Sequence, residues 1–494
     1  MREETLRIER VTLFEQDRLV LDNLSLHLFS GEILGLICVN FRGQEAMVRL
    51  IEQNIPIHYG FVYLHERQVN AYEKSDFSYN RATVIETKSR LVGDLSVAEN
   101  IFVLRHGFKN RFVNHAMLEN QVLQIADELG IRLDPTRTVR ELSFFDRCVV
   151  ALVKAYVSGS RLVVVRDISN SMSATDLRAF HRLMRHFAES GVSFLYICNH
   201  HQEVFSICDR AAIMEDGQIR KFLDPDEMTD QMIEHYCASF SKRLVREEKK
   251  LALAKQQDEE IRRGEILILR DVVTEHCSGV SFSLLQGECA VLLDMDTRIL
   301  EDLLALLSCE GRLLSGKMLI DGYPVSKKSP VSFIAENPSE SMILPSLPAI
   351  DNLCFLLDQK QPNIWRRTKF RKSIAKEFAP IFKTDIYTLE VKDLTNRQKI
   401  DLVYYRILLQ RPKLVVCVQP FAQADMYLRS HIISLINRFK KQNITFLILA
   451  VSTSDSLYVA DRILLSEKGK IVGDYTKAEF QGKQMPPDAL VPAE

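Results

Sequence analysis

The sequence predicts an α/β protein made of two tandem halves, each containing a mostly parallel sheet covered by helices. Short continuous apolar runs alternate with longer helical stretches in both halves: LVVV from 162 and FLYIC from 194, then LVVCV from 414 and FLILAV from 446. Runs of this kind are typical of strands that are buried on both faces, as in a parallel sheet. The same order of landmarks also occurs twice along the chain, which indicates an internal repeat.

The landmarks of this repeat lie at the beginning and near the end of each half. A Gly-Glu pair opens a strand, turn and helix at residues 31–32 and again at 287–288. Later, the segments DRAAIMEDGQI from Asp209 and DRILLSEKGKIV from Asp461 each contain a short apolar strand, a turn and a second strand. That order is a hairpin signature. Two copies of one fold are therefore expected.

The chain length of 494 residues also favours two domains, each large enough to bury its own core. We expect a first domain over residues 1–240 and a second, more divergent domain over residues 264–494. Between them, residues 241–263, SKRLVREEKKLALAKQQDEEIRR, are dense in charge, free of proline and rich in good helix formers. This segment is predicted to be a solvated helical linker.

Composition excludes several classes of protein. Lys and Arg total 64 against 65 for Asp and Glu, so nucleic acid is not expected as a bulk electrostatic partner. The ten cysteines are scattered singly, without the clusters of a metal site, so no metal centre is expected. No run approaches the roughly 20 apolar residues that span a bilayer, and the charged N-terminus lacks a signal-peptide pattern. A cytoplasmic protein is expected, with membrane contact only through a partner.

Residues 31–46, GEILGLICVNFRGQEA, have the outline of a phosphate-binding loop without its usual side chains. Such a loop, G-x-x-x-x-G-K-[ST], follows a strand and opens a helix. Its glycines let backbone N–H groups surround phosphates, its Lys meets the negative charge, and its hydroxyl binds magnesium. The corresponding positions here hold Cys38, Gly43, Gln44 and Glu45. Only the second glycine matches, so the pattern of the fold and the chemistry of the side chains disagree.

Taken together, the repeat, the Gly-Glu pairs and the Asp-Arg hairpins resemble the tandem ATP-binding subunit of bacterial ABC-type sugar importers, of the ribose, galactose and xylose type. The resemblance covers nearly the whole chain. It implies two ABC-type nucleotide-binding domains, each with a mostly parallel sheet, an antiparallel β part and a helical subdomain. It also implies a peripheral location on the inner face of the cell membrane, where such subunits bind a transmembrane permease.

The most specific local match is DLSVAENIFV, residues 94–103, with a looser counterpart, PAIDNLCFLL, from residue 348. In the resembled family this segment follows the Q-loop, close to the permease. The Q-loop glutamine position holds Thr87 if it is counted back from Leu95. The resemblance therefore implies permease-docking candidates at Thr87, Leu95, Val97, Glu99 and Asn100.

The family's catalytic positions carry other residues in the first half. The signature segment reads LSFFD at residues 142–146, with two phenylalanines in place of glycines. The Walker B aspartate and the catalytic glutamate correspond to Arg166 and Asp167. The switch histidine corresponds to Asn199. His200 and His201 lie beside it, and a one-residue shift would restore an imidazole, although solvated loop histidines are the expected interpretation.

The second half departs further from the family pattern. Its loop region, VLLDMDTRILEDLL from residue 291, has no glycine in the turn and carries Asp294 and Asp296 where phosphate would need donors. Its signature region reads DLTNRQKIDLV from residue 393. Val418 and Gln419 stand at the two acidic Walker B positions, and Val451 stands at the switch position.

These positions predict a pseudo-ATPase. Loss of one preorganised electrostatic group commonly costs about a hundredfold to a thousandfold in rate, and several are missing here. We expect a non-hydrolysing ABC-type protein that acts as a regulatory or structural subunit on a permease or on a functional ABC ATPase. The alternative is a genuine ATP-binding subunit that energises carbohydrate import with atypical residues. A third reading is a sensor whose former ATP cleft takes another small molecule.

Binding of ATP and magnesium remains open in this prediction. The residues that could still contact nucleotide are Phe14, Asn40, Arg42, Gly43, Gln44 and Glu45 in the first half and Arg298 in the second. The degenerate catalytic positions are Gln44, Arg166, Asp167, Asn199, Val418, Gln419 and Val451.

Overall fold

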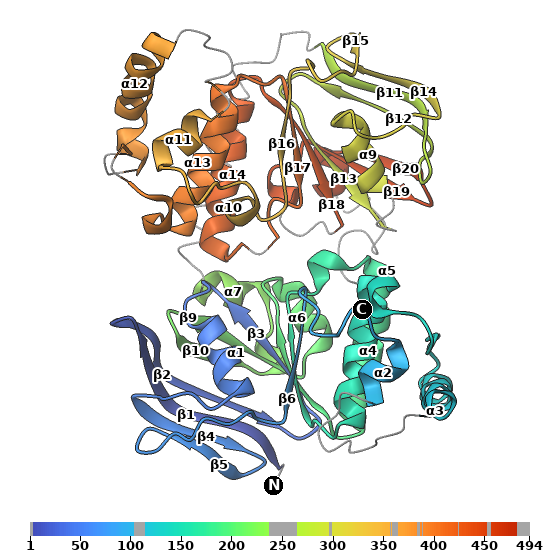
Figure 1. Cartoon of the computed structure of the whole chain (residues 1–494), viewed down its shortest axis with the longest axis vertical. Coiled ribbons are helices and arrows are strands. Elements are labelled where there is room, and N and C mark those ends of the chain that lie inside the picture. Colours follow the sequence, from blue (N-terminus) through green and yellow to red (C-terminus); the bar gives the residue numbers. More distant parts are fainter. Residues whose placement is uncertain are drawn as a thin grey trace. The chain divides into compact units, whose positions relative to one another are not determined.

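The computed structural model of the chain describes residues 3–102, 114–236, 264–295, 299–355, 357, 364–382, 386–387, 389–422, 424–451 and 456–481. The expected linker, residues 241–263, and the candidate Arg298 lie outside these ranges. Contacts divide the chain near residue 241 into two compact units (Figure 1). Each unit is described by itself below.

The first unit contains a four-stranded antiparallel sheet in the order β2-β1-β4-β5. Its strands are β1 (Glu4–Glu15), β2 (Arg18–Phe29), β4 (Tyr59–Leu64) and β5 (Arg67–Ala71). One helix, α1 (Gln44–Glu52), buries six of its nine residues in the core that this sheet shares with the larger sheet of the unit.

The larger sheet of the first unit has six strands in the order β10-β9-β3-β8-β7-β6. Five of these strands are parallel to their neighbours, and β10 closes the sheet as an antiparallel hairpin with β9. The strands are β3 (Ile33–Cys38), β6 (Ala82–Glu86), β7 (Leu162–Arg166), β8 (Ser193–Ile197), β9 (Arg210–Glu215) and β10 (Gln218–Leu223). The predicted α/β class, with a mostly parallel sheet, is confirmed.

Helices of the first unit begin mostly at side chains that cap their N-termini. Asn114, Ser143 and Ser173 each accept a hydrogen bond from a backbone N–H in the first turn of α3, α4 and α5. Besides α1, the helices of this unit are α2 (Val97–Phe102), α3 (His115–Glu128), α4 (Phe144–Val157), α5 (Ala174–Glu189), α6 (His201–Ile207) and α7 (Asp230–Tyr236), with 3-10 turns at Val139–Glu141, Ser169–Ser171 and Pro225–Glu227.

The second unit repeats this plan. Its six-stranded sheet has the order β16-β17-β18-β13-β19-β20, which matches β6-β7-β8-β3-β9-β10 strand for strand, and its four-stranded sheet has the order β12-β11-β14-β15. The strands are β11 (Glu265–Val273), β12 (Ser278–Leu285), β13 (Cys289–Asp294), β14 (Ser315–Ile320), β15 (Tyr323–Pro324), β16 (Val331–Ile334), β17 (Leu414–Val418), β18 (Thr445–Ala450), β19 (Arg462–Glu467) and β20 (Lys470–Thr476). The internal repeat is therefore a repeat of topology as well as of sequence.

The helices of the second unit are also arranged around its six-stranded sheet (Figure 1). They are α9 (Ile299–Leu307), α10 (Pro338–Ser341), α11 (Ala349–Cys354), α12 (Ile364–Phe382), α13 (Asn396–Leu409), α14 (Met426–Lys440) and α15 (Lys477–Gln481), with 3-10 turns at Val391–Asp393 and Ser456–Tyr458. No helix in the described ranges has both the length and the apolar character needed to cross a membrane.

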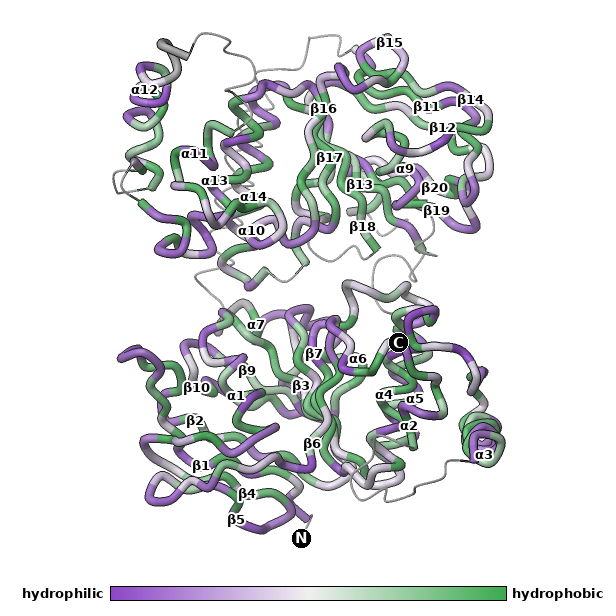
Figure 2. Tube along the Cα trace, viewed as in Figure 1, coloured by the Kyte–Doolittle hydropathy of each residue, from purple (hydrophilic) through white to green (hydrophobic). Residues whose placement is uncertain are grey.

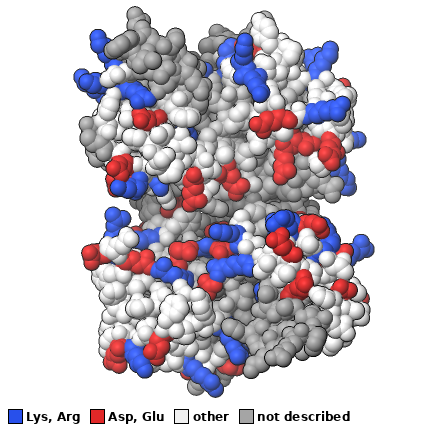
Figure 3. Space-filling model, in the orientation of Figure 1, with Lys and Arg blue, Asp and Glu red and all other residues white. Residues whose placement is uncertain are grey.

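The continuous apolar strands form the centre of each unit. Every residue of β3, β13 and β18 is buried, as the sequence pattern predicts for strands covered on both faces. Figure 2 shows these hydrophobic strands inside each unit and hydrophilic residues toward its periphery. Acidic and basic side chains are interspersed over the face of each unit in Figure 3, in keeping with the near-neutral charge of the sequence.

The Gly-Glu and Asp-Arg landmarks bind each other in the first unit. The buried carboxylate of Glu32 accepts hydrogen bonds from the backbone N–H of Phe29 at 2.8 Å and from Nε of Arg210 at 2.6 Å. Beside it, Asp209 accepts from the backbone N–H of Ile33 at 2.8 Å. The two landmarks therefore join the start of β3 to the start of β9.

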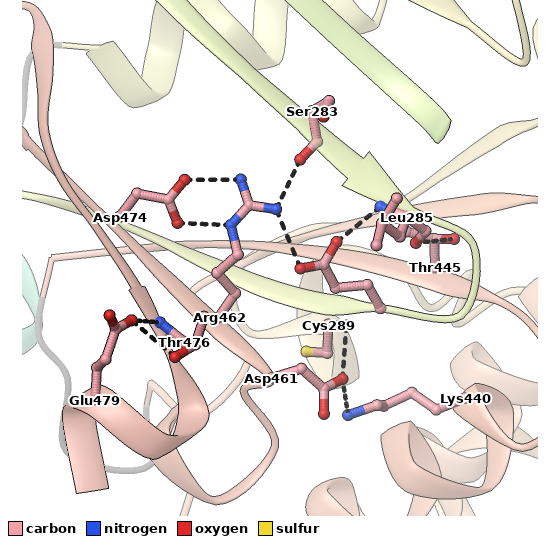
Figure 4. A network of polar contacts seen from close by, with 11 residues as sticks. Ser283, Leu285, Cys289, Lys440, Thr445, Asp461, Arg462, Asp474, Thr476 and Glu479 are labelled. Carbon is pink, nitrogen blue, oxygen red and sulfur yellow. Dashed lines mark hydrogen bonds and ion pairs between the residues drawn. The ribbon is translucent and has the colours of Figure 1, made fainter. Parts of the chain in front are cut away.

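The second unit has the same clamp, which Figure 4 shows from close by. Glu288 accepts from the backbone N–H of Leu285 at 2.7 Å and from Arg462 at 3.2 Å, and Asp461 accepts from the N–H of Cys289 at 3.1 Å. A helical cation completes each clamp: Lys440 lies 2.6 Å from Asp461, as Arg185 lies 2.7 Å from Asp209 in the first unit. The landmarks that define the repeat thus have a structural role in both units.

Candidate functional site

The turn between β3 and α1, where a phosphate loop would lie, is held by its own side chains. Asn40 Oδ1 accepts from the backbone N–H groups of Arg42 and Asp216, both at 3.2 Å. The guanidinium of Arg42 donates to the carbonyl oxygen of Leu19, from Nε at 3.0 Å and from Nη2 at 2.6 Å, and lies 3.6 Å from Asp216. The two candidates Asn40 and Arg42 therefore connect this turn to β2 and to the β9–β10 hairpin.

Gly43, the one glycine that matches the phosphate-loop pattern, is required by packing. Its φ of 83° is left-handed, and an added Cβ would lie 2.6 Å from the carbonyl oxygen of Val20 and 2.9 Å from Cα of Gly217. A side chain is disfavoured both by this backbone conformation and by those contacts. The presence of glycine here needs no phosphate to explain it.

We expect Gly43→Ala to lower the free energy of unfolding by about 2–3 kcal/mol, because left-handed strain and backbone overlap act together. Gly159→Ala is the matched control: Gly159 also has a left-handed φ, of 75°, but no atom lies within 4 Å of the added Cβ. The control should cost about 1 kcal/mol from strain alone. Urea unfolding followed by circular dichroism measures both variants, and equal losses would contradict the packing explanation.

Gln44, at the position of the phosphate-loop lysine, is 5% exposed at the first residue of α1. Its side-chain Nε2 is buried and finds no hydrogen-bond partner among the described residues. A buried amide has no net charge to offer a phosphate, and leaving its donor unsatisfied costs about 1–3 kcal/mol. The structure thus places a neutral, inward-packed group where the lysine would stand.

Arg166, at the position of the magnesium aspartate, is paired with two carboxylates. It ends β7, and its guanidinium forms ion pairs with Glu45 in the first turn of α1 and with Glu86 at the end of β6. The parallel pairing of β6 with β7 sets Glu86 directly beside Arg166. Burial alone would lower the pKa of Arg166, but the two carboxylates outweigh it and hold that pKa above its ordinary value. We call this cluster the Glu45–Arg166–Glu86 triad.

The triad continues into a longer chain of alternating charges. Arg90 lies 3.1 Å from Glu86 and also pairs with Glu52 at the end of α1. Glu86 was not among the residues predicted from the sequence. The available signal was its place next to Thr87, at the last residue of a strand, where side chains from neighbouring parallel strands meet.

Asp167 and Gln419, at the catalytic glutamate positions, share one backbone geometry. Both residues are left-handed, with φ of 51° and 43°. The N–H of Asp167 donates to Ile197 at 3.0 Å, and that of Gln419 donates to Leu449 at 2.9 Å. The hydroxyl of Thr87 donates to the carbonyl oxygen of Asp167 at 3.4 Å. The turn after this strand is therefore the same in both units, although its side chains differ.

The switch region of the first unit holds Asn199 and two histidines. Asn199 is 6% exposed, and its Oδ1 is buried without a partner among the described residues. His200 precedes α6 and is buried, whereas His201 Nε2 lies 2.8 Å from Asp230 at the start of α7. The imidazole of His201 is therefore engaged with another helix of the same unit.

A buried polar network lies beneath this switch region. Tyr196 donates its hydroxyl hydrogen to Glu203, and His181 Nε2 lies 3.0 Å from the same hydroxyl. Burial lowers the pKa of His181 to about 4 and raises the pKa of Glu203. At neutral pH His181 is accordingly uncharged. The network joins β8 to α5 and α6.

In the second unit, Asp294 occupies the start of the helix that would receive phosphate. Its carboxylate is 1% exposed, accepts from the backbone N–H of Ile299 at 2.8 Å and accepts from the hydroxyl of Ser466 at 2.8 Å. Helix N-termini attract anions, and here the anion is the carboxylate of Asp294 itself. Asp296 and Arg298 lie outside the described residues.

The other candidate positions of the second unit are apolar or structural. Val418 ends β17, and Val451 is 6% exposed within the hydrophobic core. In the signature regions, Ser143 caps α4, and Thr395 caps α13 through a reciprocal capping box with Gln398. The hydroxyl residues that matched the signature pattern therefore act as helix caps.

The docking segment is organised by a buried asparagine that occurs in both units. Asn100 is fully buried; its Oδ1 accepts from the N–H of Val92 at 2.9 Å, and its Nδ2 donates to the carbonyl oxygen of Val92 at 3.0 Å. Asn352 makes the same pair of bonds with Leu344, at 2.8 Å and 2.9 Å. Each asparagine clamps the loop that precedes its helix.

This clamp limits which docking candidates can meet a partner. Asn100 and Val97 are both 0% exposed, so neither side chain is accessible at the surface of the folded unit. Glu99 exchanges hydrogen bonds with Ser96 as a capping box, while Thr87 and Leu95 are partly exposed. Val92, which the sequence did not single out, is 44% exposed.

Phe14, the candidate for stacking on adenine, lies on the surface of the first unit. Its side chain is 43% exposed, and its ring meets His58 edge to face with centroids 5.2 Å apart. Among the described residues, no group of three or more His, Cys, Asp and Glu side chains is placed to hold a metal ion.

Comparison with known proteins shows what the chain is related to. No protein-family model matches the chain. A ribose import ATP-binding protein of Caldanaerobacter subterraneus subsp. tengcongensis is 24% identical over 480 residues, covering 93% of this chain and 94% of that protein. This chain is related to the ATP-binding subunits of sugar ABC importers. An arabinose import ATP-binding protein of Yersinia pestis is 23% identical over 468 residues, covering 92% of this chain and 88% of that protein.

Solved structures agree on the fold of this importer-related chain. An archaeal ribosome recycling factor, solved in complex with a ribosomal stalk protein, matches with a TM-score of 0.60 and 14% sequence identity, covering 98% of this chain and 95% of that one. At this identity the likeness concerns the fold alone. The predicted resemblance to tandem sugar-importer subunits is confirmed.

Proposed function

We propose that this chain is a non-hydrolysing relative of the ATP-binding subunits of carbohydrate importers. It acts as a regulatory or structural subunit on an importer permease or on a functional ABC ATPase. The observation that carries this proposal is the Glu45–Arg166–Glu86 triad. In the resembled family, the positions of Glu45 and Arg166 hold magnesium; here the two side chains neutralise each other.

Magnesium and ATP fit these residues poorly. A divalent cation placed beside Arg166 would meet a like charge, and the carboxylate of Glu45 would face the phosphates. A ligand would first have to separate Arg166 from Glu45 and Glu86, and the loss of these ion pairs offsets part of the gain from binding. Gln44 adds no positive charge, and the start of α9 in the second unit already holds Asp294.

The loop before α2, the proposed docking surface, supports a function that depends on binding a partner protein. The loop before α2 keeps a defined shape through Asn100 and presents Val92 at the surface. The named relatives are import ATP-binding proteins. We therefore place this chain on the inner face of the cell membrane, held there through a permease.

We expect Val92→Lys to weaken co-purification with the sugar-importer permease of the same organism by at least about tenfold, because it puts a charge into an apolar contact. Val472→Lys is the matched control, since Val472 is 54% exposed on β20 of the other unit. Quantitative pull-down from detergent extract measures both variants. Equal recovery of the permease with the two variants, or no recovery with the unaltered chain, would count against this docking surface.

A further inference from the structure

A cavity of about 190 Å³ lies along the edge of the six-stranded sheet in the first unit. One wall is the outermost strand, β6, and the opposite wall is α4, which packs against it. The segment Ser89–Leu91 and the end of α1 complete the lining. The volume corresponds to several water molecules at roughly 30 Å³ each, enough for a small organic molecule.

One face of α4 supplies two cations to this cavity. Arg147 and Lys154 both line it, seven residues apart on the same side of the helix, with Ala151 between them. The small side chain of Ala151 leaves open space between the two longer ones. Their flexible stems can therefore converge on one bound group.

The carboxylates that line the cavity already form ion pairs with other cations. Glu52 and Glu86 pair with Arg90, and Glu86 also pairs with Arg166. Among the described residues, neither Arg147 nor Lys154 forms an ion pair with a carboxylate, and Nε of Arg147 is buried without a hydrogen-bond partner. The lining thus carries two positive charges that the protein does not neutralise.

Half-buried cations of this kind are costly. Burial lowers the pKa of Lys154, because no carboxylate compensates its ammonium group. A buried charge is normally paired, and an unpaired donor in a cavity is best satisfied by a ligand. Two unpaired cations match the double negative charge of a phosphomonoester better than the single charge of a carboxylate.

We propose that the cavity between β6 and α4 binds a small phosphomonoester, whose phosphate lies between Arg147 and Lys154. Thr83 also lines the cavity, and its hydroxyl can donate to a phosphate or substituent oxygen. Apolar side chains, including Leu91 and Phe144, cover the body of the ligand. The cavity shares Glu86 with the Glu45–Arg166–Glu86 triad, but Arg147 and Lys154 are not part of that triad. Failure of ligand binding at these two cations would therefore leave the proposed non-hydrolysing function intact.

Isothermal titration calorimetry on the full chain tests this site, with ribose 5-phosphate as the probe. We expect saturable binding of ribose 5-phosphate, none of ribose, and binding of sulfate weaker by at least about tenfold. Arg147→Gln and Lys154→Gln should each weaken binding by about tenfold or more, since each removes a charge-assisted contact. Ala151→Leu should abolish binding by filling the space between the cations.

Arg182→Gln is the matched control, because Arg182 is exposed on α5 of the same unit. It should leave the affinity unchanged. Arg147→Gln and Lys154→Gln should each keep or raise the midpoint of thermal unfolding, because each removes an unpaired, half-buried charge. A loss of ligand binding in these variants could then not be explained by misfolding. Absence of saturable binding, equal affinity for sulfate, or unchanged affinity in both cavity variants would overturn the proposal.

Discussion

Replacing Arg210 by methionine should lower the free energy of unfolding of the first unit by about 3 kcal/mol. Glu32 is 2% exposed, and Arg210 is the cation that neutralises it, at 2.6 Å. Without the guanidinium, a buried carboxylate keeps its charge with no counter-ion. Methionine retains apolar contact with Phe29 and Phe222, whose rings lie 5.3 Å and 5.7 Å from the guanidinium carbon, so the loss should be mainly electrostatic.

The matched control for this prediction is Arg220→Met. Arg220 lies 3.3 Å from Glu215, but its side chain is 41% exposed, so the control should cost below about 1 kcal/mol. Adding Glu32→Gln to Arg210→Met should recover most of the loss, because the double variant has no buried charge left to compensate. Urea unfolding gives all the required values. A loss for Arg210→Met no larger than that of its control would refute a structural role for the clamp.

The second large effect concerns catalysis. On the proposed function, purified protein should release phosphate from Mg-ATP at the background rate, at least about 10⁴-fold below a competent ABC ATPase, because the predicted catalytic positions lack several preorganised groups together. Asp167→Asn is the decisive comparison, since Asp167 is the one acidic side chain at the predicted Walker B positions of the two units. Residual activity that is identical in both proteins comes from contaminants. Magnesium-dependent turnover that Asp167→Asn abolishes would establish the alternative, an active ATPase with atypical residues.

The sequence predicted the architecture well because the relevant signals are local. Continuous apolar runs identify buried strands, and the Gly-Glu and Asp-Arg landmarks occur in both halves at the same places. Their mutual contact, Glu32 with Arg210 and Glu288 with Arg462, could not be derived, because it joins segments more than 170 residues apart. Only the folded sheet brings them together.

The details of the site were harder to predict for the same reason. Arg166 was identified as a substituted position, but its pairing with Glu86 depends on the register of β6 against β7. Asn100 was assigned to docking from its family segment, which stays a prediction, and the structure adds that its buried side chain clamps the preceding loop. The second half of the sequence has an asparagine, Asn352, at the equivalent place. This repetition was the available signal that Asn100 has a structural role.

The two cations of the β6–α4 cavity could not be predicted from the sequence either. Arg147 and Lys154 have the spacing of an ordinary charged helix face, which a sequence alone would assign to solvent. Their burial arises because α4 packs against the edge strand of the sheet, and this packing is not encoded in any local pattern.

A thermal-shift titration of the whole chain with Mg-ATP tests most directly whether the Glu45–Arg166–Glu86 triad closes the nucleotide position of the first unit. A ligand at 100 times its dissociation constant stabilises a protein by about 2.7 kcal/mol. We expect no magnesium-dependent shift of the unfolding midpoint up to millimolar ATP. A saturable, magnesium-dependent stabilisation approaching that value would contradict the proposal and show that the site still accepts nucleotide.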